Sequence, residues 1–268
     1  MPTRIQHSFA DLRRVPRAGL VTFITAGDPT PAATLANMHA LVCGGADLIE
    51  LGVPFSDPMA DGPIIQRASE RALAGGMSLS GVLALVSEFR TRDNATPVVL
   101  MGYLNPIERM GYQSFAQRAA AAGVDGVLTV DLPPEEASEY AQAFHEFGLD
   151  QIYSLAPTSD ADRMRRIVAA ASGFVYYVSV KGVTGAKTFE IDDVRQKISA
   201  LRALTTLPVG VGFGVKTPEI AAALSSVCDA VIVGSALVEI IERHPSNAAA
   251  ALETFVASLR QALASGAA

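Results

Sequence analysis

The chain has 268 residues, of which 50% are hydrophobic and 18% are charged, so its composition allows a large core and speaks against disorder. The formal net charge of −6 argues against a surface for nucleic acid or for an anionic membrane. No apolar run approaches the ~18 residues that would span a bilayer, and residues 1–14 lack the apolar centre of a signal peptide. We therefore expect a cytoplasmic protein that binds neither nucleic acid nor membrane.

Eight short apolar runs alternate with helical patterns along the chain. The expected strands, in order, are 19–25, 47–51, 97–101, 124–130, 149–155, 174–178, 208–211 and 230–233. Apolar residues at helical spacing predict helices between them, and a short polar helix over 3–15 precedes the first strand. The best-defined helices are 31–42, 63–73, one after Ser78, one ending at 122, one from 133, one over 164–171, 191–204, one from Ser235 and one over 252–263.

This pattern predicts an α/β fold with a parallel sheet buried on both faces, because each strand is a largely continuous apolar run. A closed (β/α)8 barrel, or TIM barrel, and an open doubly wound sheet both alternate in this way. Eight units in about 250 residues favour the barrel, since an open sheet usually has fewer strands. No linker or composition shift divides the chain. We therefore expect one barrel domain over residues 1–268, with an extra N-terminal helix.

Two strand-to-helix connections are longer than the others. One follows the second strand and carries Glu50 and Asp61, and the other follows the sixth strand and includes residues 181–189. In a barrel, all such connections lie at one mouth, where barrel enzymes place their active sites. The two extended loops are therefore expected to rim a common site.

Glycine-rich turns follow the last two strands. Residues 212–214 read Gly-Phe-Gly, and Gly234 precedes Ser235 at the start of a predicted helix. Barrel enzymes commonly bind phosphate at these two positions, where backbone N–H groups and a helix N-terminus face the anion. Gly185, in the sixth loop, could close over the same group. The alternative is that these glycines only make tight turns and that Ser235 only caps its helix.

Glu50 and Asp61 are the candidate acid and base. A glutamate within a buried strand is costly unless it is paired or used, and burial would raise its pKa toward neutrality. The alternative for Glu50 is a structural ion pair. The alternative for Asp61 is the N-cap of the helix that begins at residues 62–63. Two carboxylates whose environments separate their pKa values can divide acid and base work.

Residues for several other kinds of chemistry are missing. The four histidines fall on helices or away from strand ends, which disfavours a histidine base and a histidine-ligated metal. No GxGxxG or Walker-type loop is present. Cys43 and Cys228 form no CxxC pattern, so we expect two reduced, buried apolar side chains. Any catalysis is expected to use carboxylates without metal or nucleotide.

Aromatic and apolar residues near the strand ends could complete a pocket for a flat ring. Tyr176 shares a face of its strand with residues 174 and 178, so its hydroxyl could reach the mouth. Ordinary core packing is the alternative for Tyr176 and for the other candidates. Those other candidates are Phe23, Met101, Leu128, Ile152 and Phe213.

Several stretches resemble the tryptophan synthase alpha subunit family. They are LIELGVPFSDPMADGPIIQ, YLNPIERMGYQSFAQRAAAAGVDGV, DLPPEE, LAPTS, GVTG and VGFGV. The match runs from about Leu20 to Ser235, its first motif is highly specific, and the later motifs follow in the same order. The resemblance implies a lyase that splits indole-3-glycerol phosphate into indole and glyceraldehyde 3-phosphate by a retro-aldol reaction.

The resemblance also implies roles for individual residues. Glu50 matches a glutamate that carries a proton to indole C3 and from the glycerol hydroxyl, and Asp61 matches an aspartate that holds the indole N–H. Tyr176 matches a tyrosine near Glu50. Phosphate contacts match Gly185, Gly214, Gly234 and Ser235. Pocket positions match Phe23, Met101 and Leu128, and Thr184 matches a loop threonine that orders Asp61.

The family further implies a partner, a PLP-dependent beta subunit that receives indole through a tunnel in an α2β2 assembly. No cofactor is expected in this chain itself. Pro54, Asp57 and Asn105 match positions that face the partner. The chain departs from many members at residues 179–181, where Ser-Val-Lys stands in place of Ser-Arg-Ala. Because of this departure, the resemblance does not predict how the sixth loop closes or contacts the partner.

Three other functions remain as alternatives. Lys181 could act as the Schiff-base lysine of an aldolase, although it lies in the loop where solvent would keep it charged. A barrel that binds an indole phosphate without turnover could serve only to regulate a partner. The chain could also be a lyase that acts alone.

Overall fold

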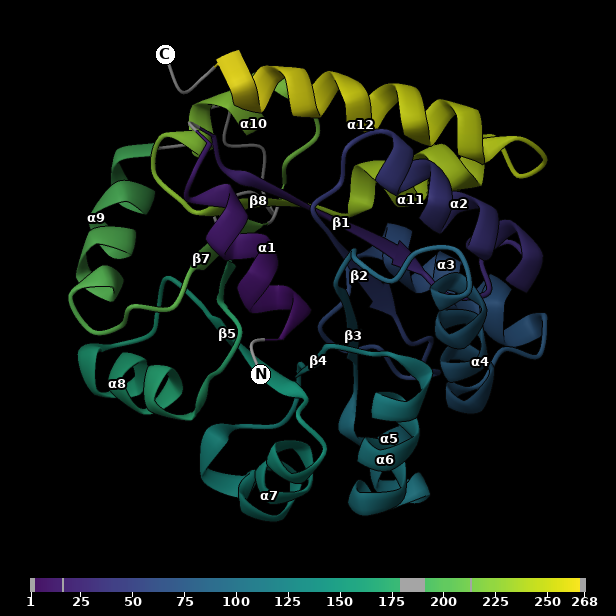
Figure 1. Cartoon of the computed structure of the whole chain (residues 1–268), viewed down its shortest axis with the longest axis horizontal. Helices are drawn as coiled ribbons and strands as arrows, with labels where there is room; N and C mark the ends of the chain where they lie inside the picture. The colour runs from purple at the N-terminus through teal and green to yellow at the C-terminus, as the bar shows by residue number, and fades with distance from the viewer. Residues whose placement is uncertain (1–2, 16, 179–190, 213, 266–268) are drawn as a thin grey trace.

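Eight short strands form a closed parallel barrel in the computed structural model, which describes residues 3–15, 17–178, 191–212 and 214–265. The strands pair in chain order, and β8 returns to pair with β1. In Figure 1 the strands lie at the centre and the helices surround them. The strands are β1 (Gly19–Thr25), β2 (Leu48–Gly52), β3 (Val98–Gly102), β4 (Gly126–Thr129), β5 (Asp150–Leu155), β6 (Val175–Val178), β7 (Val209–Gly212) and β8 (Ala230–Val233). The predicted barrel is confirmed.

Helices connect these strands, and most begin close to their predicted positions; α10, between β7 and β8, was not predicted. The first six are α1 (Arg4–Leu12), α2 (Pro31–Cys43), α3 (Pro63–Ala74), α4 (Leu79–Arg90), α5 (Leu104–Met110) and α6 (Tyr112–Ala122). The remainder are η1 (Pro134–Glu136), α7 (Ser138–Glu146), α8 (Ala161–Ala170), α9 (Ile191–Arg202), α10 (Pro218–Ser225), α11 (Ser235–Arg243) and α12 (Ala248–Ser265). Among the described helices none is by itself long and apolar enough to cross a membrane; α3 and α4 reach that length and composition only together, with a 94° bend between them.

Three local predictions were wrong. The helix expected to run to residue 122 is two helices, because Gly111 between α5 and α6 has φ +83°, which an α-helix does not allow. The helix expected from residue 133 begins as the short 3-10 turn η1, and α7 starts only at Ser138. Cys43 is exposed because it is the last residue of α2, whereas Cys228 is buried as expected.

The strands are buried on both faces, as their apolar sequences predict. Every residue of β1 and of β2 is buried. One set of side chains, which includes Val21, Leu48 and Val99, packs inside the barrel. The alternate set, which includes Ile24 and Ile49, packs against the surrounding helices. The side chain of Glu50 belongs to the first set by its position two residues after Leu48.

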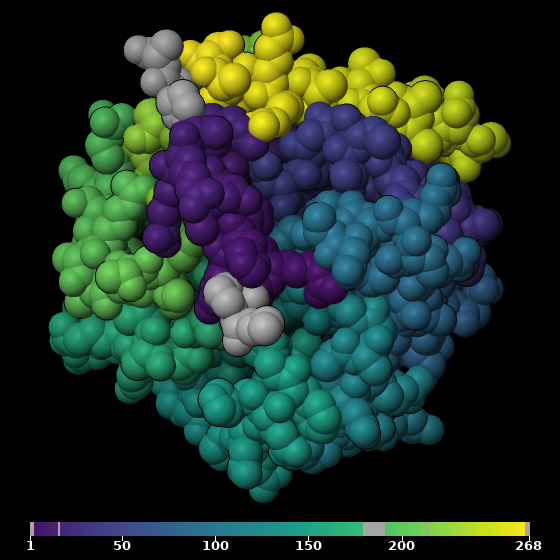
Figure 2. Space-filling model, viewed as in Figure 1, coloured from purple at the N-terminus to yellow at the C-terminus, as the bar shows by residue number. Residues whose placement is uncertain are grey.

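Helix α1 closes the N-terminal end of the barrel. Thr3 and Gln6 form a capping box that fixes its first turn. Its buried side chains join the interior cluster, and the ring of Phe9 lies 5.8 Å from that of Phe174. Figures 1 and 2 both show α1 lying across the middle of the visible face. The mouth that carries the functional loops is therefore at the opposite end of the barrel.

Paired aspartates hold the strand starts at this N-terminal end. Three strands, β2, β4 and β8, are preceded by an aspartate, namely Asp47, Asp125 and Asp229. Each of these carboxylates accepts, at 2.8 Å, a backbone N–H from the start of the neighbouring strand. The donors are Leu20, Val98 and Val209. Each aspartate also forms an ion pair with an arginine, namely Arg17, Arg90 or Arg202. These carboxylates are therefore structural, because every one has both a backbone donor and a cation.

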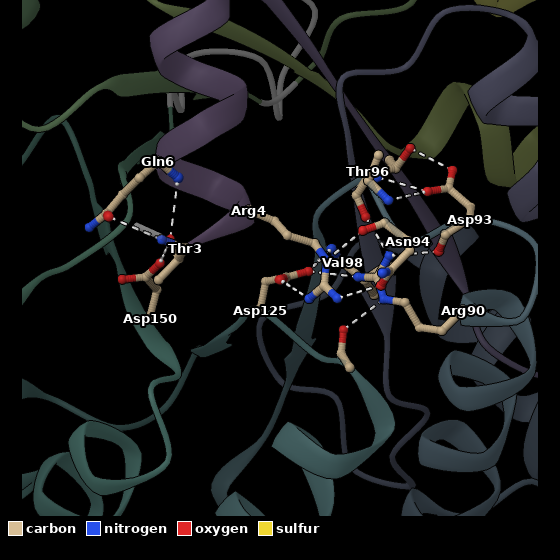
Figure 3. Close-up of polar contacts among 12 residues, drawn as sticks. Thr3, Arg4, Gln6, Arg90, Asp93, Asn94, Thr96, Val98, Asp125 and Asp150 are labelled. Carbon is tan, nitrogen blue, oxygen red and sulfur yellow. Dashed lines mark hydrogen bonds and ion pairs between the residues drawn. The ribbon is translucent and has the colours of Figure 1, made fainter. Parts of the chain in front are cut away.

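The start of α1 is attached to this layer (Figure 3). Arg4 donates to Asp125 at 2.9 Å, and Arg90 donates to the other oxygen of that carboxylate at 2.7 Å. Thr3 donates its hydroxyl proton to Asp150 at 2.8 Å. The side chain of Asp125 is only 4% exposed, so its two arginines and the N–H of Val98 replace the water it has lost.

Candidate active site

Glu50 is buried inside the barrel with no partner among the described residues. It pairs in register with Phe23 of β1 and Val99 of β3, so its side chain faces the interior with theirs. It is 0% exposed, and neither carboxyl oxygen has a hydrogen-bond partner in the part of the chain that the structure describes. Loss of water raises the pKa of Glu50 to about 8. The side chain therefore holds a proton at neutral pH.

The alternative of a structural ion pair at Glu50 has no support in the described residues. Among the described residues, salt bridges lie at the N-terminal end of the barrel and on the helices, and none includes Glu50. A buried carboxyl group without a partner costs stability. Such a cost is typical of a group that acts on a substrate.

Asp61 lies at the end of the loop after β2, beside Tyr103. The N-cap of α3 is Gly62, and no side chain caps this helix, so the alternative reading of Asp61 as a helix cap is wrong. Partial burial raises the pKa of Asp61 to about 6, and a hydrogen bond from Tyr103 limits that rise. At neutral pH Asp61 is therefore largely ionised while Glu50 is largely protonated.

Tyr103 supports the loop that carries Asp61. Its hydroxyl oxygen accepts the backbone N–H of Ala60 at 3.0 Å, and its ring stacks on Phe55 at 5.2 Å. Burial and the charge of Asp61 raise the pKa of Tyr103 to about 12, although the hydrogen bond from the N–H of Ala60 lowers it in part. The hydroxyl therefore stays protonated and can donate to Asp61. Our sequence reasoning missed Tyr103, although its place directly after β3 was the available signal.

Tyr176 lies inside the barrel near Glu50, as the alternation on β6 predicts. It packs against the interior cluster that includes Phe174. Burial and the nearby Glu50 carboxylate place the pKa of Tyr176 well above its usual value. A Cβ on Gly212 would lie 2.5 Å from the Tyr176 hydroxyl, so this position on β7 requires glycine. The small residue leaves the space that the hydroxyl occupies.

A small cavity, partly open to solvent, lies at the mouth beside Asp61. Its walls come from the ends of β1, β2 and β3, from β4 and from α3. Lining residues are Phe23, Thr25, Gly52, Val53, Asp61, Ile65, Ser69, Met101, Gly102, Tyr103 and Val130. The structure thus brings Phe23 and Met101 together with Asp61 in an apolar pocket with few polar groups, a composition typical of ligand sites.

Thr25, which lines the cavity, was not predicted as a site residue. The hydroxyl of Thr25 is buried without a hydrogen-bond partner among the described residues. Leu128 and Ile152, which we expected in the pocket, do not line this cavity; both are buried in the interior cluster beneath it. Strand alternation had placed them correctly inside the barrel but could not give their depth.

The start of α11 adjoins this cavity. A Cβ on Gly234 would lie 3.4 Å from the Cβ of Phe23, so the turn after β8 touches the pocket wall. No side chain caps the first turn of α11, which begins at Ser235. Its N–H groups and helix dipole can therefore face an anion. Gly214 has φ +76° with open space around its Cα, as expected of a turn that lets backbone approach a ligand.

Comparison with known proteins agrees with this arrangement. A family model described as "Tryptophan synthase alpha chain" matches residues 9–266. The chain belongs to the tryptophan synthase alpha chain family. As a member of this family it is a carbon–carbon lyase of tryptophan biosynthesis, which cleaves indole-3-glycerol phosphate.

Two similar relatives are tryptophan synthase alpha chains from Nitrosococcus oceani and Burkholderia cenocepacia. The first is 57% identical over 258 residues, which cover 96% of this chain and 95% of the relative. The second is 58% identical over 262 residues, which cover 97% of each. Such identity over nearly the full length leaves no room for a different family.

Solved structures of the family have the same fold. The alpha subunit from Legionella pneumophila matches with a TM-score of 0.92 and 44% identity, over 98% of this chain and 99% of that one. A chain of tryptophan synthase from M. tuberculosis, in an aminoacrylate-bound form, matches with a TM-score of 0.88 and 36% identity, over 98% and 100%. The barrel and its helices are therefore those of tryptophan synthase alpha chains.

The positions that the resemblance assigned to the partner lie around the loop after β2. Asp57 and Asn105 are exposed, whereas Pro54 is buried within the chain. Met59, on the same loop, is 85% exposed, which is unusual for a large apolar side chain. This surface adjoins Asp61, so a protein bound there would lie next to the loop that carries Asp61.

Several predicted site residues lie outside the described residues. They are Phe213, Lys181, Thr184 and Gly185. Val180, where the chain departs from many family members, lies there too. Within the described ranges, no group of three or more His, Cys, Asp and Glu side chains is arranged to hold a metal ion.

Proposed function

We propose that Glu50 and Asp61 together catalyse the retro-aldol cleavage of indole-3-glycerol phosphate. The observation that carries this proposal is a buried carboxyl group with a pKa of about 8 beside Phe23, a residue of the cavity, together with a carboxylate of that cavity with a pKa of about 6. Glu50 can give a proton at neutral pH, and the ionised carboxylate of Asp61 can stabilise a positive charge on the substrate. Two carboxyl groups in different environments can divide the work in this way.

In the first step, protonated Glu50 gives its proton to C3 of the indole ring. The ring becomes a cation whose N–H is held by ionised Asp61. The resulting Glu50 carboxylate then removes the proton of the hydroxyl group on the carbon attached to C3. The bond between that carbon and C3 breaks, and its electron pair neutralises the ring. Indole leaves with the proton from Glu50 on C3, glyceraldehyde 3-phosphate leaves as well, and Glu50 is protonated again by the proton of the hydroxyl group.

The other predicted residues would position the substrate. Tyr176, near Glu50, would orient the carboxyl group, and the apolar walls at Phe23 and Met101 would hold the indole ring. Leu128 and Ile152 are proposed to support the floor of the pocket from the interior cluster, and Phe213 and Thr184 are proposed as further residues around the substrate. The backbone at Gly234 and Ser235, with Gly214 and Gly185, would bind the phosphate through N–H donors, which suits a chain of negative net charge.

Tryptophan synthase alpha chains work with a beta subunit, to which the PLP of the family belongs. We propose that this chain joins such a subunit in an α2β2 assembly through the surface of Asp57, Asn105 and Pro54. The exposed side chain of Met59 supports an interface there. We also propose that the whole chain acts as one barrel domain, in the cytoplasm, with no cofactor of its own.

Indole release from indole-3-glycerol phosphate tests this function. The purified chain would be assayed with and without a tryptophan synthase beta subunit, as wild type, as Glu50→Gln and as Glu88→Gln, which alters an exposed glutamate on α4. We expect activity that rises with the partner, disappears in Glu50→Gln and survives in Glu88→Gln. A partner can raise the rate by ordering loops around the substrate.

Other outcomes would favour the alternatives. Strong activity without the partner would indicate a lyase that acts alone. Substrate binding without turnover, unchanged in Glu50→Gln, would indicate a barrel with only a regulatory role. A covalent adduct at Lys181 after borohydride trapping with substrate would replace the carboxylate mechanism by a Schiff-base mechanism.

A further inference from the structure

Helices α3 and α11 are joined by a cluster of ion pairs on the outside of the barrel. Glu242 of α11 accepts from Nε and Nη2 of Arg67 at 2.7 and 2.8 Å, and from Nη1 of Arg71 at 2.9 Å. Both arginines belong to α3. One carboxylate thus holds two consecutive turns of the neighbouring helix, and we call these residues, with Asp28, the α3–α11 clamp.

The clamp continues inward to the loop after β1. Arg71 also makes two parallel hydrogen bonds to Asp28, from Nε at 2.8 Å and from Nη2 at 2.9 Å. The side chain of Asp28 is only 1% exposed. Exposed ion pairs contribute little because water screens them and side-chain entropy opposes them. The clamp differs because its geometry is bidentate at both ends and one of its carboxylates is buried.

Apolar packing continues the same contact toward the pocket. Ala68 of α3 and Val238 of α11 are fully buried in a small cluster with Phe23. Ala68 lies beside Arg67 in the chain, and Val238 lies one helical turn before Glu242. The clamp and this cluster therefore fix the two helices against each other and against a wall of the cavity.

The two helices carry opposite ends of the proposed substrate site. The chain enters α3 directly from Asp61, and Ile65 of α3 lines the cavity. Helix α11 begins at Ser235, where we place the phosphate. Glu242 lies about 10 Å along α11 from Ser235 at 1.5 Å per residue. None of the clamp residues lines the cavity at the mouth.

We propose that the α3–α11 clamp sets the distance between the ring-binding end and the phosphate-binding end of the site. Arg67, Arg71 and Glu242 are then positioning residues for a ligand of fixed length. The proposal rests on the proposed function, because it uses the assigned ring and phosphate ends. It adds to that function the structural element that makes the site prefer the linked substrate over its two halves.

Binding of whole and divided ligands tests this role. In a Glu50→Gln background, which prevents turnover, dissociation constants would be measured by NMR titration for indole-3-glycerol phosphate, for indole and for glycerol 3-phosphate. The product of the two fragment constants divided by the constant of the linked ligand is an effective concentration. It reports how well the site holds both ends at the correct separation.

We expect Glu242→Gln to lower this effective concentration about tenfold, while each fragment binds within about twofold of its original affinity. Glu239→Gln is the matched control, because it removes the ion pair with Arg243 on the same helix without touching α3. If Glu242→Gln fails to fold, Arg67→Gln is used instead, since the pairs of Arg71 with Glu242 and Asp28 remain.

Two results would overturn the proposal. In one, the linked ligand binds Glu242→Gln as tightly as it binds the Glu50→Gln background. In the other, the linked ligand weakens by the product of the factors by which the two fragments weaken, so that the effective concentration is unchanged and the clamp has only a structural role. Failure of the proposed function is distinct from both, because the chain would then bind no indole-3-glycerol phosphate before the clamp is altered.

Discussion

The two ends of the barrel use carboxyl groups in opposite ways. At the N-terminal end, Asp125 accepts two arginines and a backbone N–H. On β2, inside the barrel, Glu50 is equally buried but has no partner among the described residues. Burial costs stability in both places, but only at the N-terminal end do partners offset that cost. An unpaired buried carboxyl group therefore marks the end of the barrel where a substrate completes the contacts.

Replacing Glu50 tests the chemical end of this comparison. Glu50→Gln keeps the size of the side chain but removes the proton it exchanges. We expect kcat for indole release to fall about 10²- to 10⁴-fold, the usual contribution of a general acid and base. A loss of less than tenfold, in a variant that is folded by circular dichroism, would contradict the role of Glu50.

The same variant should be more stable than the wild type, and the difference should be larger at high pH. The pKa of Glu50 is about 8 in the folded chain, above its usual 4.5, so the folded state binds this proton more tightly than the unfolded state. Stability is therefore lost as the pH rises from about 4.5 to about 8. Glutamine does not ionise, so we expect Glu50→Gln to raise Tm more at pH 8 than at pH 5.

Replacing Asp125 tests the structural end. Asp125→Ala leaves Arg90, whose side chain is only 9% exposed, without its carboxylate. We expect the free energy of unfolding to fall by about 3–5 kcal/mol, because a buried charge then lacks a partner. Urea unfolding measures this change, and kcat of the folded fraction should stay near the wild-type value. Asp11→Asn, in an exposed pair with Arg14, is the control and should cost less than about 0.5 kcal/mol.

The pH dependence of kcat/KM should show both carboxyl groups of the mouth. Asp61 must be ionised, so the rate constant falls below its pKa of about 6. Glu50 must be protonated, so the rate constant falls above its pKa of about 8. We expect a bell-shaped profile with a tenfold loss per pH unit outside these limits. A profile that is flat from pH 5 to pH 9 would contradict this division of roles.

Tyr103 should have a smaller effect that is confined to one limb of this profile. Tyr103→Phe removes the hydrogen bond that lowers the pKa of Asp61. Loss of about 1 kcal/mol raises the pKa of Asp61 by about 0.7, so kcat/KM at pH 6 should fall about threefold. At pH 8 the change should be small. Tyr112→Phe, a tyrosine of α6 outside the cavity, should leave the profile unchanged.

Most elements of the fold could be predicted because they depend on local patterns. The bounds of β1 and β8 agree with the prediction, and Ser78 caps α4 as expected. The errors have local causes as well. The left-handed backbone at Gly111 divides a helical pattern that is otherwise continuous. Apolar spacing carries no sign of φ, so this break could not be seen in it.

The candidate site divides in a similar way. Alternation along β2 and β6 predicted that Glu50 and Tyr176 face inward. It could not reveal that Tyr103, from the end of β3, donates to Asp61 across the mouth. It also left open whether Asp61 caps α3, a role that belongs to Gly62. Contacts between different strands and loops depend on how the barrel closes.

Short apolar strands at regular intervals were enough to specify a closed parallel barrel and to place Glu50 and Asp61 at its mouth, because periodicity and chain order fix which strand ends meet. Closure of the barrel then determined the chemistry of these groups. It removed water from Glu50 without supplying a partner among the described residues, and it gave Asp125 two arginines from distant elements. Desolvation and pairing both depend on neighbours far along the chain, so they arise only in the folded molecule.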